Sequence, residues 1–441
     1  MGIWSWLAGG ETTTLRPSIR IGRYSDCYKK RENYKAWELS LQAFEKEEYL
    51  ESFRQFFNYL SDESQKNISW SEKNKGISAV LIQGSQKVKI SADNNRFTAF
   101  TSIAKAEQLN IGLMRRLLEH NDNLLYGHFA LSPENEIKVV FSSNSIDCSP
   151  YKLYFALKEL ATISDKQDNL LLDEFTNLSI IDPSLRIQLP DIEKEQKYNY
   201  CIQTLQDKLN FILDSKIDFD LHSKAESYWL LDALFRIDYL ICPEGFVMEV
   251  IERAFREFSE NDGSNLLQKN YKLKKEIQSI LDRPKVSHLH ELYDISSTFG
   301  ITDVVTFDRV VEVINEHLIN GDWYEKNGYS QIAQSVYNYI VGFIFFTSAV
   351  PKNIKEALRL YFEVVEEKYF NSFGYQLKFR KDDGSINRKE IERLLAEIFH
   401  NNMENFPLAR FEPRLVNFNN ITEFSKSFLL MITKLDMSKT K

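Results

Sequence analysis

The chain has 441 residues, a length typical of two or three domains that each bury a core of their own. Its 43% hydrophobic and 27% charged residues are ordinary for a soluble globular protein, and its formal charge of −8 argues against sequence-independent nucleic-acid binding, which needs a basic surface. The four cysteines form no CxxC pair, which argues against a disulfide framework or a zinc knuckle and favours reduced thiols in the cytoplasm.

Residues 1–33 are predicted to be an extended leader. Trp4, Trp6 and Leu7 form a small apolar tip, and basic residues outnumber acidic ones in the part that follows. Two interpretations stay open: an arm packed back onto the protein, or a contact with a partner or a membrane surface, into which aromatic side chains insert. No integral membrane segment is expected, because the start lacks the features of a signal peptide and the longest uncharged apolar run, 339–350, is shorter than the ~20 residues that a spanning helix needs.

Residues 35–60 have a strongly helical pattern. The stretch from Ala43 to Phe57 is similar to the centre of a tetratricopeptide repeat, in which a small residue and an aromatic end one helix and a tyrosine opens the next. No second copy follows at the spacing of about 34 residues that this repeat requires. A single helical hairpin is therefore predicted, with Ser52 allowing close packing.

Strand patterns and one helical period alternate in residues 66–179. The expected order is strands at 77–83, 87–92 and 97–104, a helix at about 108–119, a strand hairpin made of 124–131 and 136–142, and a helix at about 151–162. Leu113 and Leu117 share one face of the first helix, as its core-facing side requires. These elements predict an α+β domain over residues 34–179, with a small antiparallel sheet flanked by helices.

The spacing of apolar residues and turns in this region follows a recognisable pattern. It comprises Leu113-Met114 through Leu117-Leu118, the Asn121-Asp122-Asn123 stop, Tyr126 through Leu131, Val139-Val140-Phe141, and the helical runs Leu153–Ala161 and Asp165–Phe175. In these residues the chain resembles the YbjN family and the wider type III secretion chaperone-like fold. The resemblance implies a small domain that binds protein segments and often forms homodimers, without catalytic residues. Tyr126 and His128, on the strand face opposite Phe129, are the residues expected to contact a partner.

Residues 180–194 are predicted to be a linker, because Asp182-Pro183 and Leu189-Pro190 break regular structure. Residues 195–371 show helical periodicity almost throughout, which predicts a mostly α-helical domain. The expected helices are 198–213, 225–241, 246–258, 266–281, 307–317 and 332–350, with breaks at 242–245, 261–263 and 320–322. Residues 372–441 form a mixed C-terminal segment, with a strand expected at 375–379 and helices at about 387–400 and 422–434.

One helix of this domain, 228–241, carries charged residues within an otherwise apolar run. Asp232 and Arg236 stand four residues apart and can pair along the helix, and Glu249 follows in the next helix. Charged groups in an apolar setting can form a cleft with shifted pKa values, as in an enzyme. The simpler interpretation is an ion-paired seam between two packed helices.

Three short patterns imitate metal sites but are incomplete. Residues 382–390 match the second half of an EF-hand loop, whose first two carboxylates are missing. Glu397 and His400 have the spacing used in di-iron bundles, which need that motif twice, and His288 and His290 lack an identifiable third ligand. No metal or cofactor site is therefore predicted.

The leading hypothesis is a soluble, cytoplasmic bacterial protein that is not an enzyme and binds a protein partner as a chaperone-like or regulatory module. A curved sheet flanked by helices could take up an extended or helical partner segment. Two alternatives stay open: an enzyme with its site near Asp232, Arg236 and Glu249, and a scaffold at the membrane surface that uses Trp4 and Trp6.

Overall fold

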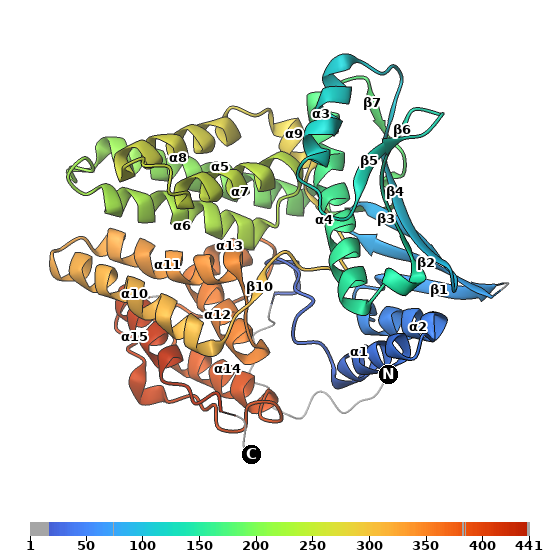
Figure 1. Cartoon of the computed structure of the whole chain (residues 1–441). Coiled ribbons are helices and arrows are strands. Elements are labelled where there is room, and N and C mark those ends of the chain that lie inside the picture. The colour runs from blue at the N-terminus through green and yellow to red at the C-terminus, as the bar shows by residue number, and fades with distance from the viewer. Residues whose placement is uncertain (1–16, 74, 382, 384, 439–441) are drawn as a thin grey trace, which may run out of the picture.

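The computed structural model describes residues 17–73, 75–381, 383 and 385–438. Within them the chain forms a sheet domain (residues 31–180) and a helical domain (residues 191–438), which confirms the predicted α+β class (Figure 1). No helix in these described ranges is long and apolar enough to cross a membrane.

The chain enters the sheet domain through a pair of helices, α1 (Arg31–Glu45) and α2 (Tyr49–Leu60), which confirms the predicted helical hairpin. Ser40 and Ser52 are buried where the two helices touch. The Ser40 hydroxyl donates to the carbonyl of Ser52 at 2.8 Å, and the Ser52 hydroxyl donates to the carbonyl of Ser40 at 2.9 Å. The small side chain at each position therefore permits close approach and also satisfies its own hydroxyl group.

The described residues of the sheet domain form a seven-stranded sheet with the order β1-β2-β3-β4-β6-β5, in which β7 also pairs with β4. The strands are β1 (Ile68–Lys73), β2 (Gly76–Gln83), β3 (Gln86–Ala92), β4 (Arg96–Ala106), β5 (His128–Leu131), β6 (Glu136–Asn144) and β7 (Leu178–Ile180), all paired antiparallel. The inner face, with Phe97, Phe129 and Phe141, packs against α2, α3 (Ile111–Asn121) and α4 (Pro150–Glu174) and forms the core of this domain.

The strand predicted to begin at Leu124 starts only at His128, and this prediction is corrected. The carboxylate of Glu159, on α4, accepts hydrogen bonds of 2.7–2.9 Å from three successive backbone N–H groups, those of Leu125, Tyr126 and Gly127. Because a side chain already satisfies these donors, they do not join the ladder of the neighbouring strand. Helix α4 is also longer than expected and continues beyond Thr162.

The helical domain stacks its helices in two layers, with α5 to α8 above α10 to α15 in the view of Figure 1. Its helices are α5 (Asp191–Asp214), α6 (Ser223–Ile241), α7 (Gly245–Ser259), α8 (Leu266–Leu281), α9 (Lys285–His290), α10 (Phe307–Lys326), α11 (Ser330–Thr347), α12 (Lys352–Val365), α13 (Glu367–Asn371), α14 (Arg388–Asn401) and α15 (Ile421–Thr433). Two-residue strands pair β8 (Ile187–Gln188) with β9 (Tyr293–Asp294) and β10 (Asp303–Val304) with β11 (Ser348–Ala349). Helices α6 and α11, which are buried along most of their length, pack against each other in the centre.

Two sequence predictions in this domain are wrong. Helix α10 continues through Gly321, where a break was expected. This glycine does not end the helix but lets α10 approach α11 closely, because a Cβ there would lie 2.4 Å from Cε1 of Tyr337 on α11. The segment 375–379 is not a strand in the described structure. Its backbone N–H groups donate to the side chains of Asn371 and Glu367 rather than to a neighbouring strand.

Two extended segments cross between the domains and hold them together. The N-terminal strap (residues 17–30) is the extended part of the predicted leader that the structure describes, whereas residues 31–33, also predicted to be extended, already belong to α1. The strap runs along the helical domain, where the N–H of Gly22 donates to the carbonyl of Tyr239 at 2.6 Å. Further along this strap, buried Asp26 accepts a hydrogen bond of 2.7 Å from Tyr154 on α4. The strap therefore contacts both domains.

The second crossing segment is the central strap (residues 293–301), which leaves the helical domain and docks on the sheet domain. Its first residues form β9 and pair with β8, inside the region predicted to be a linker. Arg186, at the start of β8, is buried and donates to Asp168 of α4 at 3.0 Å. Residues 180–194 therefore pack against both domains, and Phe299 of the strap lies in the core of the sheet domain.

Candidate functional site

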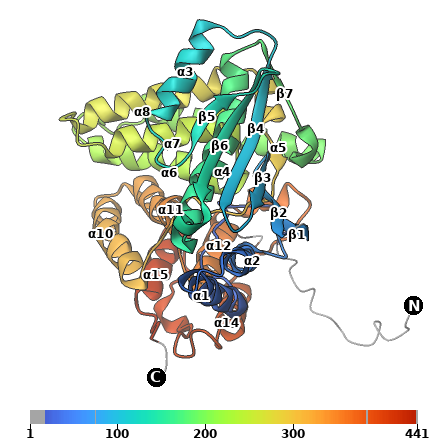
Figure 2. The ribbon, with the colours of Figure 1, turned by 45° about the vertical axis from the view of Figure 1, so that its right-hand side comes forward.

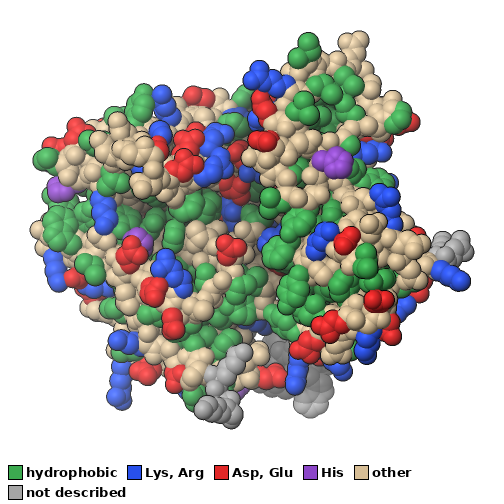
Figure 3. All heavy atoms as spheres, in the orientation of Figure 1, with side chains coloured by type: hydrophobic (Ala, Val, Ile, Leu, Met, Phe, Trp, Pro, Cys, Tyr) green, Lys and Arg blue, Asp and Glu red, His purple; other side chains and the backbone are tan. Residues whose placement is uncertain are grey.

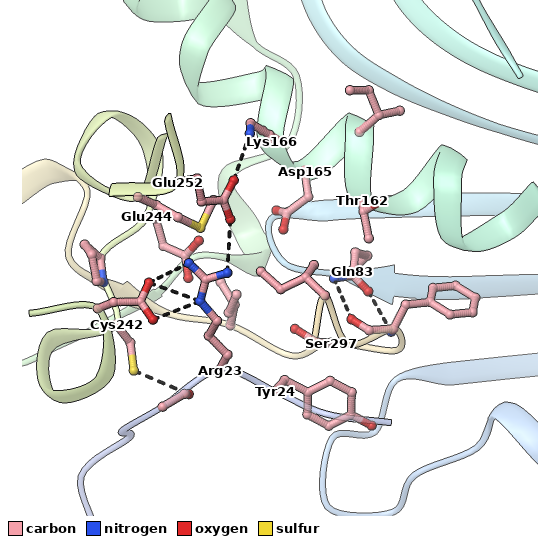
Figure 4. Close-up of a pocket in the computed structure, with 18 of the residues that line it drawn as sticks. Arg23, Tyr24, Gln83, Thr162, Asp165, Lys166, Cys242, Glu244, Glu252 and Ser297 are labelled. Atoms are coloured by element: carbon pink, nitrogen blue, oxygen red, sulfur yellow. Dashed lines mark hydrogen bonds and ion pairs between the residues drawn. The ribbon is translucent and has the colours of Figure 1, made fainter. Parts of the chain in front are cut away.

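A cavity of about 460 Å³ lies where the two domains meet, and we call it the interdomain cavity (Figure 4). Its wall comes from both straps, the end of β2, the middle of α4 and the junction of α6 with α7. Its polar lining residues include Arg20, Arg23, Tyr24, Gln83, Glu159, Thr162, Asp165, Lys166, Asp238, Glu244, Glu252 and Ser297. In the space-filling view, acidic and basic side chains gather at this seam (Figure 3). A cavity of this size at a domain interface is a typical small-molecule site.

The end of β2 reaches the cavity because Gln83 holds the central strap. Its Oε1 accepts hydrogen bonds from the N–H groups of Thr298 (3.1 Å) and Phe299 (2.9 Å), and its Nε2 donates to the carbonyl of Phe299 at 3.3 Å. The next residue, Gly84, has a φ of +57°, and a Cβ there would lie 1.8 Å from Oδ1 of Asp165. The tip of the β2–β3 hairpin can therefore meet α4 only with a glycine at this position.

The cations that line the cavity all have carboxylate partners. The ion pairs are Arg20–Glu244 (3.2 Å), Arg23–Asp238 (2.7 Å), Arg23–Glu252 (3.2 Å), Lys166–Glu252 (2.8 Å) and Lys166–Glu249 (2.5 Å). Arg23 also stacks on the ring of Phe346, with its guanidinium carbon 4.0 Å from the ring centre. These positive charges are neutralised within the wall, which makes the cavity a poor site for an anionic ligand.

Asp165 differs from these carboxylates, because it forms no ion pair with any described residue. Its Oδ1 accepts hydrogen bonds from the backbone N–H of Ser85 (2.8 Å) and from the Ser85 hydroxyl group (3.3 Å), and its Oδ2 accepts none from the described residues. Figure 4 shows the carboxylate turned from α4 into the space between α4 and Arg23. Burial, together with the negative charges of Glu244 and Asp168, raises the pKa of Asp165 well above its ordinary value.

Replacement of Asp165 by asparagine is expected to stabilise the protein at neutral pH by about 1 kcal/mol, because this half-buried carboxylate bears only part of the roughly 1–3 kcal/mol that a fully buried, poorly compensated polar group costs. The folded pKa lies above the ordinary value of 3.8, so the carboxyl group opposes folding increasingly as the pH rises above that value. Thermal unfolding at pH 7.5 and at pH 3.5 measures the effect. The variant should unfold a few degrees higher at pH 7.5, and the difference should be close to zero at pH 3.5. An unchanged or lower unfolding temperature at pH 7.5 would show that Asp165 is well compensated.

Two further groups of the cavity, Cys242 and Glu244, have pKa values that burial raises. Burial raises the pKa of the Cys242 thiol, which contacts the carbonyl of Gly22 at 3.5 Å, so this cysteine is not an activated thiolate. Burial also raises the pKa of Glu244 to about 7, although Arg20 opposes the shift. Tyr24, another lining residue, donates its hydroxyl group to the carboxylate of Asp62 at 3.1 Å.

The structure brings together only two of the residues predicted for an enzyme site. Asp232 and Arg236 form a bidentate ion pair, with N···O distances of 2.7 and 3.1 Å, at a second cavity of about 440 Å³ inside the helical domain. Glu249 lies apart from them and pairs with Lys166 beside the interdomain cavity. The reason is that Asp232 and Arg236 face α5 and α11, whereas α7 packs on α4 and directs Glu249 toward it.

Asp232 is the centre of a buried charge network in that second cavity. The Lys208 ammonium donates to Asp232 at 2.7 Å and to Ser335 at 3.0 Å, and Arg236 also donates to Glu366 at 2.5 Å. Burial lowers the pKa of Lys208 to about 8, although Asp232 opposes the shift. Each charged group has a partner on a neighbouring element, as in the ion-paired seam that was the simpler interpretation.

The sheet has a second candidate surface, the face turned away from the core, which we call the open face. Its outward-pointing residues include Ser69, Ser71, Ser78, Val80, Lys87, Lys89, Ser91, Arg96, Thr98, Phe100, His128, Lys138, Val140 and Ser142. His128 is exposed on this face and pairs in register with Val140, whereas the next residue, Phe129, points to the other face of the sheet and is buried. Tyr126 precedes the strand, and its backbone is bound by Glu159. Figure 2 turns β3, β4 and β6 of this sheet toward the viewer.

Sequence reasoning missed the carboxylates of α4, although one signal was present. Asp168 lies on the buried face of this helix, at helical spacing from Leu157 and Leu160. A charged residue at an apolar position of a helix indicates an unusual environment. Trp4 and Trp6 lie outside the described residues. Comparisons of the chain with protein-family models and with curated proteins find no match.

Proposed function

We propose that the protein is a non-enzymatic, chaperone-like or regulatory binding protein whose sheet domain takes up an acidic, extended segment of a partner protein on the open face. The observation that supports this most is one row of residues, in register across six strands. The row consists of Ser69, Val80, Lys89, Phe100, Val140 and His128. An aromatic ring among cations and small apolar side chains is a typical centre of an interaction surface.

The ring of Phe100 lies between two cations. The Lys89 ammonium is 5.9 Å and the Lys138 ammonium 5.4 Å from the ring centre. Lys89 forms no ion pair with a described residue, whereas the Lys138 ammonium forms an ion pair with the carboxylate of Glu136 at 3.3 Å. Arg96 and Lys105 lie on the same strand as Phe100, whereas Lys87 is paired with Asp182 at 2.6 Å. A basic patch on a chain of formal charge −8 favours an acidic partner, because complementary charge steers association and excludes other partners.

Hydroxyl groups form the neighbouring row of the open face. Ser71, Ser78, Ser91, Thr98 and Ser142 stand opposite one another on successive strands. Each hydroxyl can donate and accept a hydrogen bond. This row could therefore bind the backbone of an extended segment laid across the strands, while Phe100 and Val140 contact its apolar side chains.

A protein segment suits this face better than a nucleic-acid strand does. Surfaces that bind single strands stack successive bases on several aromatic rings, and Phe100 is the one Phe, Tyr or Trp on the described part of the open face. The resemblance to YbjN-type and secretion-chaperone-like domains is part of this proposal, since it implies the same kind of partner.

A double charge reversal, Lys89→Glu with Lys138→Glu, is expected to weaken binding of an acidic peptide at least tenfold, or about 1.4 kcal/mol. The ligand is a fluorescent decapeptide of alternating glutamate and valine, and anisotropy measures its affinity at two salt concentrations. Phe100→Ala should weaken binding without changing the salt dependence, since it removes contact area and no charge.

The matched control reverses two exposed lysines, Lys35 of α1 and Lys46 directly after it, as Lys35→Glu with Lys46→Glu, and leaves the open face intact. Equal affinity in both double variants, or no binding to the native protein, would contradict the proposal. Tighter binding of a single-stranded RNA decamer that displaces the peptide would favour nucleic acid instead. Self-association that the open-face variants abolish would identify a second copy of the chain as the occupant.

A further inference from the structure

We propose that the interdomain cavity binds a small organic cation, an amine or guanidine with an apolar body, whose positive group pairs with Asp165. This site is separate from the open face, and its ligand is of a different class from the acidic segment proposed there. Failure of either test therefore leaves the other proposal standing.

The charge balance of the wall favours a cation. The lining contains three basic residues, Arg20, Arg23 and Lys166, and five acidic ones, Glu159, Asp165, Asp238, Glu244 and Glu252. The basic groups are all engaged in ion pairs with carboxylates. Glu159 is occupied by backbone N–H groups, and Asp165 is the remaining carboxylate without a positive partner among the described residues.

Asp165 is also held in place for such a contact. The N–H of Ser85 donates a hydrogen bond to its Oδ1, and the backbone of Gly84, which has no side chain, packs against the carboxylate. These two contacts fix the orientation of the Asp165 side chain. Its Oδ2 is left to face the cavity (Figure 4). An ammonium or guanidinium group placed there would gain a charge-assisted hydrogen bond in partly dry surroundings, where such a bond is stronger than in water.

The rest of the ligand would meet apolar side chains. Leu124, Ile163, Met248, Ile295 and Ile301 line the same cavity, and they come from both domains and from the central strap. A volume of about 460 Å³ accommodates a ligand much larger than an inorganic ion. One positive group beside an apolar wall therefore selects an amphipathic cation.

Binding of such a cation should release a proton. Burial and neighbouring carboxylates favour the protonated form of Asp165 in the free protein, and a positive ligand favours the ionised form. The affinity should therefore increase as the pH rises above the ordinary carboxyl pKa of 3.8, and the loss of this increase in Asp165→Asn distinguishes Asp165 from the neighbouring carboxyl groups of Glu244 and Asp168. The apparent binding enthalpy at neutral pH should also differ between buffers of different ionisation enthalpy, which a purely apolar binding event would not produce.

Isothermal titration calorimetry of the full chain tests the proposal with hexylamine, 4-phenylbutylamine and agmatine, and with 4-phenylbutanol and calcium chloride as uncharged and inorganic comparisons. At least one amine is expected to bind, more tightly than the alcohol and calcium. Asp165→Asn should weaken this binding at least tenfold and abolish its buffer dependence. Met248→Trp, which fills the cavity from α7, should weaken it without removing the carboxylate.

The matched control is Asp214→Asn, which removes an exposed carboxylate at the end of α5 and should leave binding unchanged. Thermal unfolding of each variant verifies that it is folded. The proposal is overturned if none of the three amines binds the native protein, if Asp165→Asn binds them equally well, or if the alcohol or calcium binds as tightly as the best amine.

Discussion

Replacement of Phe299 by alanine is expected to destabilise the protein by about 3–5 kcal/mol, the usual cost of truncating a buried phenylalanine. The side chain is 1% exposed and packs edge-on against Tyr154 of α4, with ring centres 5.5 Å apart. It belongs to the core of the sheet domain, although it lies between helices of the other domain in the sequence. The variant therefore leaves a cavity in one domain and loosens the strap that comes from the other.

Differential scanning calorimetry should detect both consequences. The native protein is expected to unfold in one transition, because the straps couple the two cores, and Phe299→Ala should separate it into two. Ile301→Ala is the matched control: this residue belongs to the same strap but is 45% exposed, so its loss should cost less than about 1 kcal/mol. A single transition near the native temperature in the Phe299 variant would show that the strap is not a stabilising link.

Replacement of Asp232 by asparagine is expected to cost about 3–5 kcal/mol, because it leaves buried cations without their partner. Asp232 is 1% exposed and accepts hydrogen bonds from both Lys208 and Arg236. Arg236 keeps the carboxylate of Glu366, whereas Lys208 keeps the hydroxyl group of Ser335 and the ring of Trp229, 3.5 Å away, but no carboxylate. The uncompensated charge should therefore be that of Lys208.

The loss caused by Asp232→Asn should depend on pH. Lys208 loses its proton near pH 8 in the folded protein and near its ordinary value of 10.5 in the unfolded chain. The unfolded chain therefore binds more protons between these values, and a rise in pH favours the folded state. Urea unfolding at pH 6.5 and pH 9.5 should give a smaller difference between variant and native protein at the higher pH.

A second substitution identifies the source of this loss. Lys208→Met in the Asp232→Asn background removes the unpaired ammonium and should restore part of the stability at pH 6.5, as expected for two residues that interact directly. If the double variant loses as much free energy of unfolding as the two single variants lose together, Asp232 and Lys208 do not stabilise the protein through their mutual interaction. Catalytic use of Asp232 would then need separate evidence, from a ligand that binds in the second cavity.

Local patterns in the sequence accounted for most of the elements. The period of 3.6 residues is visible in α6 and α8, and the alternation of inward and outward side chains in β2 and β3 is visible in the strands themselves. The pairing of Asp232 with Arg236 was also predictable, because residues four apart on a helix are neighbours. These features depend on a few adjacent residues and on the geometry of one element.

The interdomain cavity could not be predicted in this way. No described residue of α4 forms an ion pair with Asp165. Its surroundings are formed by Ser85 and Gly84 of the β2–β3 hairpin and by Glu244 of the other domain, all distant in the sequence. Likewise, β5 begins late because Glu159, about thirty residues further along the chain, binds the backbone before it.

Sequence alone determined the class of fold, the helices and most strands, since backbone period and turn chemistry are local properties. The tertiary structure decided which charges find partners, because that depends on which distant segments pack together. The straps make this plain: residues 17–30 lie on the helical domain and residue 299 lies inside the sheet domain, so each domain is completed by a segment from beyond its own boundaries. The absence of an ion-pair partner for half-buried Asp165 among the described residues is a consequence of that packing, and no periodicity in the chain encodes it.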